Sequence, residues 1–419
     1  MRAAARVAAI AVATAIVAAP ARAPAEEPAA AAALDAEEEV PLPARVDEVE
    51  VTGLTRTKPY VARREIGFAE GDEVTTAMLD LAVARLWNTS IFAHVKGRVV
   101  RRGGRVVAAF VLEDRFTLNP LVGYGFGGSA FFFRVGASEN NLFGHFLEAQ
   151  AQYQFFDGFH GGQVIFRNPR TFGRRLETSL GVERLVRPRP GFADQRSLAR
   201  LEVLALADED VLRVGARVEA FADRFLPPLD GPERFPAATE TLLFEPTARV
   251  GRVDTVRLRQ KGASLEVRQG IGATSSPVTS TYTQTTAELL GFVVAGERWN
   301  FAMRARLATI SRVPEHLELY VGGLDLLRGY LDNYVRTRGY VLYNLEVRYV
   351  AFDSTWIALM PVAFTDGMAS EVAPRARFSA GVGVRVLVPK FVGTGLRFDL
   401  AVPFHQPTVA PNFGVYQFF

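Results

Sequence analysis

The sequence predicts a mainly β protein: a 16-stranded antiparallel transmembrane β-barrel preceded by one small α+β domain. Three observations support this fold class. From residue 117 to the end of the chain, apolar and polar residues alternate, which is the period of a β-strand with two different faces. The alternating runs are eight to sixteen residues long. Strands that cross a bilayer need about 9 to 11 residues, whereas sandwich strands usually have about 5 to 6. The gaps between runs are alternately short and long, as in outer-membrane barrels.

The composition excludes several classes of protein. Apolar residues make up 49% of the 419 residues, which is too many for a disordered chain. The chain has no Cys, so disulfide scaffolds, thiolate metal sites and cysteine nucleophiles are excluded. The 48 basic and 45 acidic residues are interleaved, and the net charge is only +3. We therefore expect no nucleic-acid partner.

The first residues have the pattern of a secretory signal peptide. Two arginines precede an apolar run over residues 7–19, and A-x-A cleavage sites follow that end at Ala21 and at Ala25. The run is too short for a membrane-spanning helix, which needs about 20 apolar residues. We expect a signal peptide over residues 1–25, with Ala21 as the alternative cleavage position.

A flexible linker and a small domain are expected next. Residues 26–43 are rich in Ala, Glu and Pro, which indicates a linker. Residues 44–114 predict the order strand, helix, helix, strand, strand. The last two strands, over residues 91–101 and 105–113, are joined by a turn that contains Gly103 and Gly104.

This domain resembles a POTRA (polypeptide-transport-associated) domain. The resemblance rests on "VDEVEVTGLTRTKPYVARREIGFAEGDEVT", on "LDLAVARLWNTSIFAHV" and on the closing "VLED". It implies a periplasmic domain that receives an unfolded or extended client polypeptide. An unrelated α+β domain is the alternative. A free sheet edge can pair with an extended client, and we expect this edge along the strand that carries Phe92, Val95 and Val99.

The barrel is predicted over residues 117–419. The expected strands are 117–127, 129–138, 145–156, 161–168, 174–186, 195–208, 210–225, 239–253, 255–270, 282–296, 298–311, 339–352, 354–367, 375–389, 393–404 and 412–419. The apolar face should meet lipid and the polar face should line a lumen, because only a closed barrel satisfies every backbone group in a bilayer. The alternative is a secreted β protein.

The barrel half resembles the BamA/TamA superfamily, also called the bacterial surface antigen family. The segment "GGLDLLRGYLDNYVRTRGYVLYNLEVRY" carries the resemblance, and Leu327, Arg328, Gly329 and Tyr330 match the family's sixth-loop motif, which enters the lumen. The turn that starts at Asn141 fits the family's first periplasmic turn. The resemblance implies that the chain inserts or translocates polypeptides at the outer membrane.

Three residues are the expected lumen partners of this loop. Glu346 lies on the polar face of its strand, and Phe364 with Asp366 resembles the family's aromatic-x-Asp motif. The family usually has one more residue before the glycine, whereas Gly367 follows Asp366 directly. The planar guanidinium of Arg328 suits bidentate pairing with a carboxylate. The alternative is that these charges are ordinary solvated lumen residues.

The C-terminus resembles the terminal signal by which such barrels are recognised. Phe413, Val415 and Phe419 share one face of the last expected strand, and Gln417 interrupts that face.

No catalytic residue, metal site or cofactor is expected. A G-x-G-x-x-G string over residues 123–128 is followed by a strand, whereas a dinucleotide site needs a helix there. The five histidines show no metal-ligand spacing, and no Ser/His/acid set converges. We therefore expect that the protein is not an enzyme.

The expected function is outer-membrane protein assembly or polypeptide translocation in a Gram-negative bacterium. The expected partners are outer-membrane lipid, unfolded or extended clients, and periplasmic chaperones or accessory lipoproteins. A passive pore or structural barrel is the alternative, because such a protein would need neither the small domain nor the Arg328 loop. The identity of the client is not predicted by the sequence.

Overall fold

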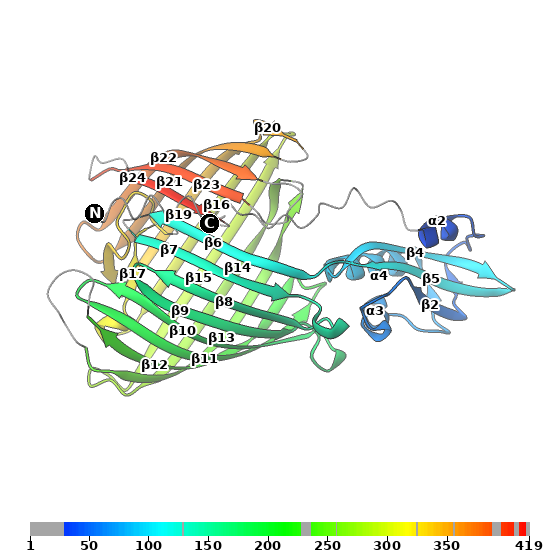
Figure 1. Cartoon of the computed structure of the whole chain (residues 1–419), viewed down its shortest axis with the longest axis horizontal. Coiled ribbons are helices and arrows are strands. Elements are labelled where there is room, and N and C mark those ends of the chain that lie inside the picture. Colours follow the sequence, from blue (N-terminus) through cyan, green and yellow to red (C-terminus); the bar gives the residue numbers. More distant parts are fainter. Residues whose placement is uncertain are drawn as a thin grey trace.

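The computed structural model shows a β-barrel with a small α+β domain at one of its mouths (Figure 1). The structure describes residues 29–127, 130–227, 236–256, 258–323, 326–354, 357–387, 395–405 and 410–415. The predicted signal peptide and Phe419 of the predicted terminal signal lie outside these residues.

The barrel is closed, and in the described residues it consists of sixteen long strands and one two-residue strand. Its strands are β6 (Leu118–Gly127), β7 (Ala130–Glu139), β8 (Glu148–Phe156), β9 (Phe159–Asn168), β10 (Leu176–Arg189), β11 (Phe192–Ala207), β12 (Leu212–Leu226), β13 (Thr239–Val256), β14 (Arg259–Thr274), β15 (Thr281–Ala295), β16 (Trp299–Ile310), β19 (Gly339–Tyr349), β20 (Phe352–Asp353), β21 (Ala358–Ser370), β22 (Ala376–Leu387), β23 (Gly395–Pro403) and β24 (Ala410–Val415).

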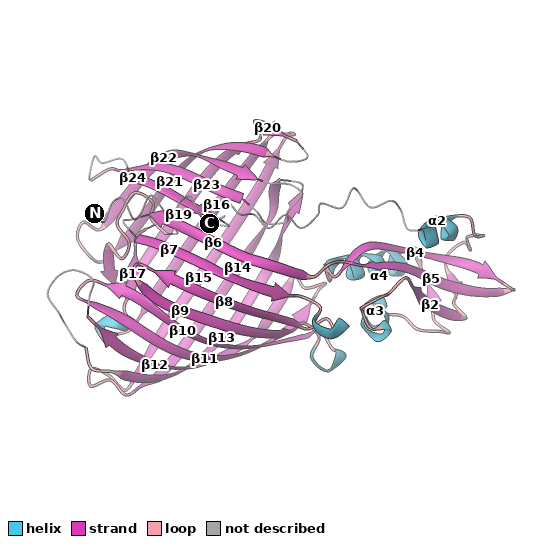
Figure 2. Ribbon diagram, viewed as in Figure 1, coloured by secondary structure: helices cyan, strands magenta, loops and turns pink. Residues whose placement is uncertain are grey.

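Neighbours along the chain pair antiparallel, and β24 pairs with β6 to close the barrel. The short β20 forms a hairpin with β21, so β19 and β21 are direct neighbours. The prediction of a sixteen-stranded antiparallel barrel is confirmed, and Figure 2 shows how far β-structure dominates the chain. The strand ends shift by a few residues: β8 begins at Glu148 because residues 142–144 form a 3-10 turn.

The two faces of the barrel differ as the alternation predicts. Leu180 and Val182 point outward and are more than half exposed, and similar Leu, Val and Phe side chains are exposed on most other strands. Polar side chains such as Arg304 and Asn344 are buried on the lumen side, where Arg304 donates to Asn344. The molecule therefore presents an apolar outer surface and a polar interior. Within the described residues, no helix has the length and apolarity to cross a membrane.

The α+β domain packs two helices on one face of a three-stranded sheet. The sheet has the order β2 (Glu48–Thr52), β5 (Arg105–Asp114) and β4 (Phe92–Arg102), with β2 parallel to β5. Helix α3 (Pro59–Ile66) begins with a proline and ends at Gly67, and the hydroxyl of Thr75 caps helix α4 (Thr76–Asn88). Strands β1 (Ala44–Arg45) and β3 (Glu73–Val74) form a separate small sheet.

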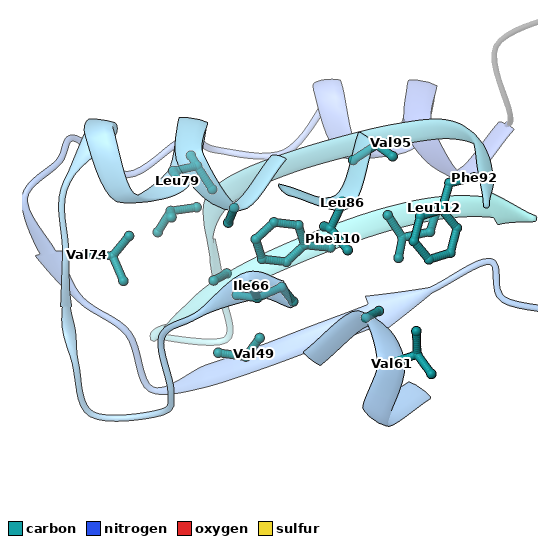
Figure 3. Packing of buried hydrophobic residues seen from close by; sticks show 14 of the residues in the cluster. Val49, Val61, Ile66, Val74, Leu79, Leu86, Phe92, Val95, Phe110 and Leu112 are labelled. Atoms are coloured by element: carbon teal, nitrogen blue, oxygen red, sulfur yellow. The ribbon is translucent and has the colours of Figure 1, made fainter. Parts of the chain in front are cut away.

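The core of this domain lies between the helices and the sheet. Ile66 of α3 and Leu86 of α4 meet Phe110 of β5, and all three are at most 1% exposed (Figure 3). Val95 and Leu112 from the sheet complete the same cluster. The predicted α+β architecture is therefore present.

The prediction of a flexible linker over residues 26–43 is wrong for most of that segment. Residues 29–35 form helix α2 (Ala29–Asp35), and residues 38–40 run along strand β4. Two causes explain this order. Ala has the highest helix propensity. The face of the sheet opposite α3 and α4 is apolar, and the segment buries it. Neither the helix nor its contact with the apolar face of the sheet could be predicted from the low-complexity composition of this segment.

Candidate functional site

A long loop between β16 and β19 enters the barrel lumen. It contains a 3-10 turn (Glu315–Leu317) and a small hairpin of β17 (Leu319–Val321) and β18 (Val335–Thr337). In the segment that connects β17 to β18, Leu327, Arg328 and Tyr330 are at most 2% exposed. The loop motif selected from the sequence thus lies buried inside the barrel.

Arg328 is hydrogen-bonded to three carboxylates on three strands. Its Nε and Nη2 donate to Asp366 of β21 at 2.7 and 2.6 Å, which is a bidentate pair. Its Nη1 donates to Glu346 of β19 at 2.7 Å and to Asp399 of β23 at 3.3 Å. The backbone N–H of Arg328 also donates to Asp366 at 3.1 Å. Burial alone would lower the pKa of Arg328, but these carboxylates raise it above its usual value.

Aromatic and backbone contacts hold the rest of the motif. The guanidinium of Arg328 lies 3.6 Å from the centre of the Phe364 ring, which is a cation–π contact. The hydroxyl of Tyr330 donates to the carbonyl of Phe378 at 3.1 Å. Asn344 donates to the carbonyl of Leu326 at 3.0 Å. The loop is therefore attached to four strands of the C-terminal half of the barrel.

Three further arginines balance the buried carboxylates. Arg348 and Arg385 donate to Glu346 at 2.7 and 2.9 Å, and Arg385 and Arg397 each donate to Asp399 at 2.6 Å. We call Arg328, Arg348, Arg385, Arg397, Glu346, Asp366 and Asp399 the lumen cluster. Its side chains are at most 5% exposed. Removing a single member would leave its partners buried with an incomplete set of charges.

Two glycines of β22 make room for the lumen cluster. A Cβ atom at Gly383 would overlap the carboxylate of Asp399, and one at Gly381 would overlap the ring of Phe364. Gly367, where the sequence departs from the family pattern, provides space on the outer face instead, for Tyr343 and Phe378. This departure therefore leaves Asp366 in contact with Arg328.

The α+β domain is joined to the barrel by a junction of polar contacts. Within the domain, Asp114 at the end of β5 accepts hydrogen bonds from the backbone N–H groups of Thr55 and Arg56 at 2.7 and 2.6 Å, which positions the loop that contacts the barrel. Asn141 of the β7–β8 turn donates to the hydroxyl of Thr57 at 2.8 Å. In the same turn, the carbonyl of Gly144 accepts from the N–H of Lys58 at 2.9 Å.

Ion pairs attach the two helices of the domain to two further turns. Glu65 of α3, which is 3% exposed, accepts hydrogen bonds from Arg170 of the β9–β10 turn at 3.1 to 3.3 Å. Arg85 of α4 donates to both carboxylate oxygens of Glu209 in the β11–β12 turn, at 2.7 and 3.1 Å. The hydrogen bond from Arg85 lowers the pKa of Glu209 to about 2. The domain is thus held on three turns of one mouth.

The predicted client-pairing edge needs a correction. The side chains of Phe92, Val95 and Val99 point into the domain core and are at most 6% exposed. The backbone edge of β4 is not free around Val99, because the carbonyl of Val99 accepts a hydrogen bond from the N–H of Val40. Sequence reasoning missed this because it treated residues 26–43 as a linker.

Of the predicted terminal signal, Phe413 lies where the barrel closes. Its ring is 4.4 Å from that of Phe398 and 4.9 Å from that of Tyr124 on the first strand, measured between ring centres. Val415 pairs with Leu396 through the backbone. In the described residues, no group of three or more His, Asp or Glu side chains is placed to hold a metal ion.

Sequence reasoning selected Arg328, Glu346, Phe364 and Asp366, which the structure brings together. It did not select Asp399 or Arg385. Both lie on the polar faces of alternating strands, which was visible in the sequence. Which lumen residues meet depends on the tilt and stagger of the strands, and these are set by the closed barrel.

Neither the comparison with protein-family models nor that with curated proteins gave a match. Solved structures do match. BamA from Haemophilus ducreyi lacking POTRA domains 1-3 aligns with a TM-score of 0.65 and 15% identity, over 88% of this chain and 84% of that chain. CdiB from Acinetobacter baumannii aligns with a TM-score of 0.63 and 11% identity, over 89% and 73%. CdiB from Escherichia coli aligns with a TM-score of 0.63 and 12% identity, over 89% and 76%. The alignments cover more of this chain than the barrel alone, and the chain therefore has the fold of BamA and CdiB, as its resemblance to the BamA/TamA superfamily predicted.

Proposed function

We propose that the protein lies in the outer membrane of a Gram-negative cell and inserts or translocates polypeptides there. In this proposal, the α+β domain lies in the periplasm and receives unfolded or extended clients. The proposal includes no catalytic chemistry and no cofactor.

One observation carries this proposal: the α+β domain is fixed to one mouth of the barrel. Glu65 is 3% exposed where it meets Arg170, and the hydrogen bond from Asn141 to the hydroxyl of Thr57, between side chains that are also buried, adds a second contact of this kind. A domain on a loose tether could sample any orientation, whereas this one presents its sheet in a fixed position relative to the barrel. A polypeptide bound to the domain is therefore held beside the barrel mouth.

The outer surface of the barrel supports the membrane location. Leu180, Val182, Val214 and Leu242 are 47 to 55% exposed on its outside. Soluble proteins seldom expose apolar surface on this scale, whereas lipid-facing strands require it.

The loop inside the lumen argues against a passive pore through which solutes diffuse freely. The loop between β16 and β19 enters the lumen and is held by the buried Arg328. A passive pore, which is the alternative, needs an open path and no docked domain.

A reconstitution experiment tests the proposal. The purified protein is placed in liposomes, and a urea-unfolded eight-stranded outer-membrane barrel is added as the client. We expect the protein to accelerate its folding into the membrane, as measured by protection from protease. Glu65→Arg should slow this reaction because Arg170 then repels the domain, and the exchanged pair Glu65→Arg/Arg170→Glu should restore it.

Ion conductance separates the alternatives. A passive pore would conduct equally with and without residues 44–114 and would accelerate no client. If the unfolded client instead becomes protected inside the liposome without entering the bilayer, translocation rather than insertion is the activity.

A further inference from the structure

The sheet of the α+β domain has a second apolar face that its two helices do not cover. Val100 of β4 and Val107, Ala109 and Val111 of β5 form this face, and they are at most 5% exposed. Their cover is the N-terminal segment. Ala31 and Leu34 of helix α2 pack against them and are 0% and 1% exposed.

The segment also pairs with the edge of the sheet. The N–H of Val40 donates to the carbonyl of Val99 at 2.9 Å, and the N–H of Arg101 donates to the carbonyl of Glu38 at 3.0 Å. These two bonds flank the antiparallel pair of Glu39 and Val100. Residues 38–40 thus act as a short added strand on β4.

Charge complementarity fixes the same segment. Arg102 of β4 donates to both carboxylate oxygens of Glu37, at 2.6 and 2.7 Å. Arg98 pairs with Asp35 and Glu39, and Lys96 pairs with Asp35. Strand β4 therefore presents a basic edge, and the segment that covers it is acidic.

The segment is held by interactions that are individually weak. A helix of seven residues is unstable on its own in water. Its ion pairs are solvent-accessible, since Asp35 and Glu39 are more than half exposed, and such pairs contribute little and are screened by salt. The tether to the domain adds a high local concentration to these contacts.

We propose that residues 29–40, the tethered segment, occupy a docking site for an extended acidic segment of another polypeptide. The docking site consists of three parts: the apolar face around Val100 and Val107, the backbone edge at Val99–Arg101, and the basic side chains Lys96, Arg98 and Arg102. A partner that fits has an aliphatic anchor followed by several acidic residues in extended conformation. It binds by displacing the tethered segment.

This inference rests on the proposed function, and it specifies the class of client or accessory partner. The tethered segment then acts as a competitor. It covers the edge of β4 until a suitable partner binds, and this protects the edge from unspecific pairing.

Peptide binding tests the inference directly. The probe is a fluorescent synthetic peptide with the sequence of residues 29–40. It is titrated in detergent against the full chain and against a variant that lacks residues 29–40, and binding is followed by fluorescence anisotropy. We expect the shortened chain to bind the peptide at least tenfold more tightly than the full chain, and we expect this binding to weaken with added salt. Equal binding to the two proteins, or no binding to either, would overturn the inference.

Charge reversal supplies matched controls. In the shortened chain, Arg98→Glu/Arg102→Glu should abolish peptide binding. Arg105→Glu should leave it unchanged, because Arg105 is 70% exposed on the side chain and pairs with Glu48 rather than with the segment. If both variants lose binding to the same extent, the site is not the one proposed.

A point variant covers the case in which the shortened chain does not fold. Leu34→Asp in the full chain removes the apolar anchor of the tethered segment, and it should raise the affinity for the wild-type peptide at least tenfold. Unchanged affinity would overturn the inference. Peptide binding is measured without any transport, so its failure leaves the proposed function untouched, and a failure of client insertion leaves the docking site untouched.

Discussion

Arg328 is the residue whose replacement should change the lumen loop most. Arg328→Ala leaves the buried Asp366, Glu346 and Asp399 without their shared partner. Breaking such a pair commonly costs about 3–5 kcal/mol, because the remaining charge keeps its desolvation penalty. We expect faster proteolysis near Gly329 with the barrel still inserted. Lys at this position should restore protection only in part, since it lacks the planar fork.

A second arginine of the same loop is the control for this prediction. Arg336 pairs with Glu315 and Glu318, but its side chain is 45% exposed. Exposed pairs contribute about 0–1 kcal/mol, so Arg336→Ala should leave the proteolysis rate close to that of the wild type. If the two variants behave alike, the lumen cluster does not hold the loop.

We expect His316 to make the same loop sensitive to pH. Its Nε2 lies 2.9 Å from the hydroxyl of Thr239 and 3.5 Å from Asp223, whose charge Arg196 offsets through a bidentate pair. Burial lowers the pKa of His316 from 6.5 to about 4, against the opposing effect of Asp223, and Arg196 and Arg189 lower it further.

The direction of the pH effect follows from this lowered pKa. Below about pH 6.5 the unfolded loop binds a proton that the folded loop does not, so stability falls as the pH decreases towards 4. The hydrogen-exchange protection factors of residues 314–323 and 326–338, which are corrected for the intrinsic exchange rate at each pH, should therefore fall between pH 6.5 and 4.5. His316→Gln should remove this change with pH. A change of equal size in that variant would show that other groups cause it.

At the scale of single elements, two turns that resemble each other offer a matched comparison. In both turns a phenylalanine and a glycine have positive φ: 55° and 78° at Phe143 and Gly144, and 55° and 71° at Phe172 and Gly173. A Cβ atom at Gly144 would overlap the carbonyl of Arg56 in the junction, whereas one at Gly173 meets nothing within 4 Å.

Alanine at these two glycines should therefore have different effects. Both substitutions place a side chain in a left-handed conformation, which costs about 1 kcal/mol or more. Only Gly144→Ala should also displace the domain from the barrel, which spin labels on the domain and the barrel would show as a broader distance distribution. An equally broad distribution for Gly173→Ala would contradict the role of the junction.

The sequence predicted some elements well and others poorly, for physical reasons. The barrel strands were predicted because an apolar outside and a polar inside impose a strict alternation on every strand of a closed barrel. Helix α2 was missed because its alanines carry no periodic pattern, and only the folded sheet shows which apolar face they cover. Asp366 was predicted as a neighbour of Arg328 because it belongs to a sequence motif. Asp399 was missed because only the stagger of the strands in the closed barrel brings it to Arg328.

For the whole molecule, the closed barrel predicts resistance to detergent. In the described residues each of the sixteen long strands pairs with two neighbours, and the seam between β24 and β6 consists of the pairs Phe413–Phe126 and Gly414–Gly125. Without heating, the protein should keep its fold in sodium dodecyl sulfate and migrate differently from the boiled chain. Identical migration of the two samples would contradict a closed barrel.

The lumen cluster also has a consequence for how long the folded molecule lasts. Its members come from the loop and from β19, β21, β22 and β23, so the complete cluster exists only when all four strands are in register. We expect these contacts to form after the rate-limiting step of folding, and contacts of that kind mainly slow unfolding. Loss of Arg328 should therefore shorten the lifetime of the native barrel, while the time that the barrel needs to fold stays nearly the same.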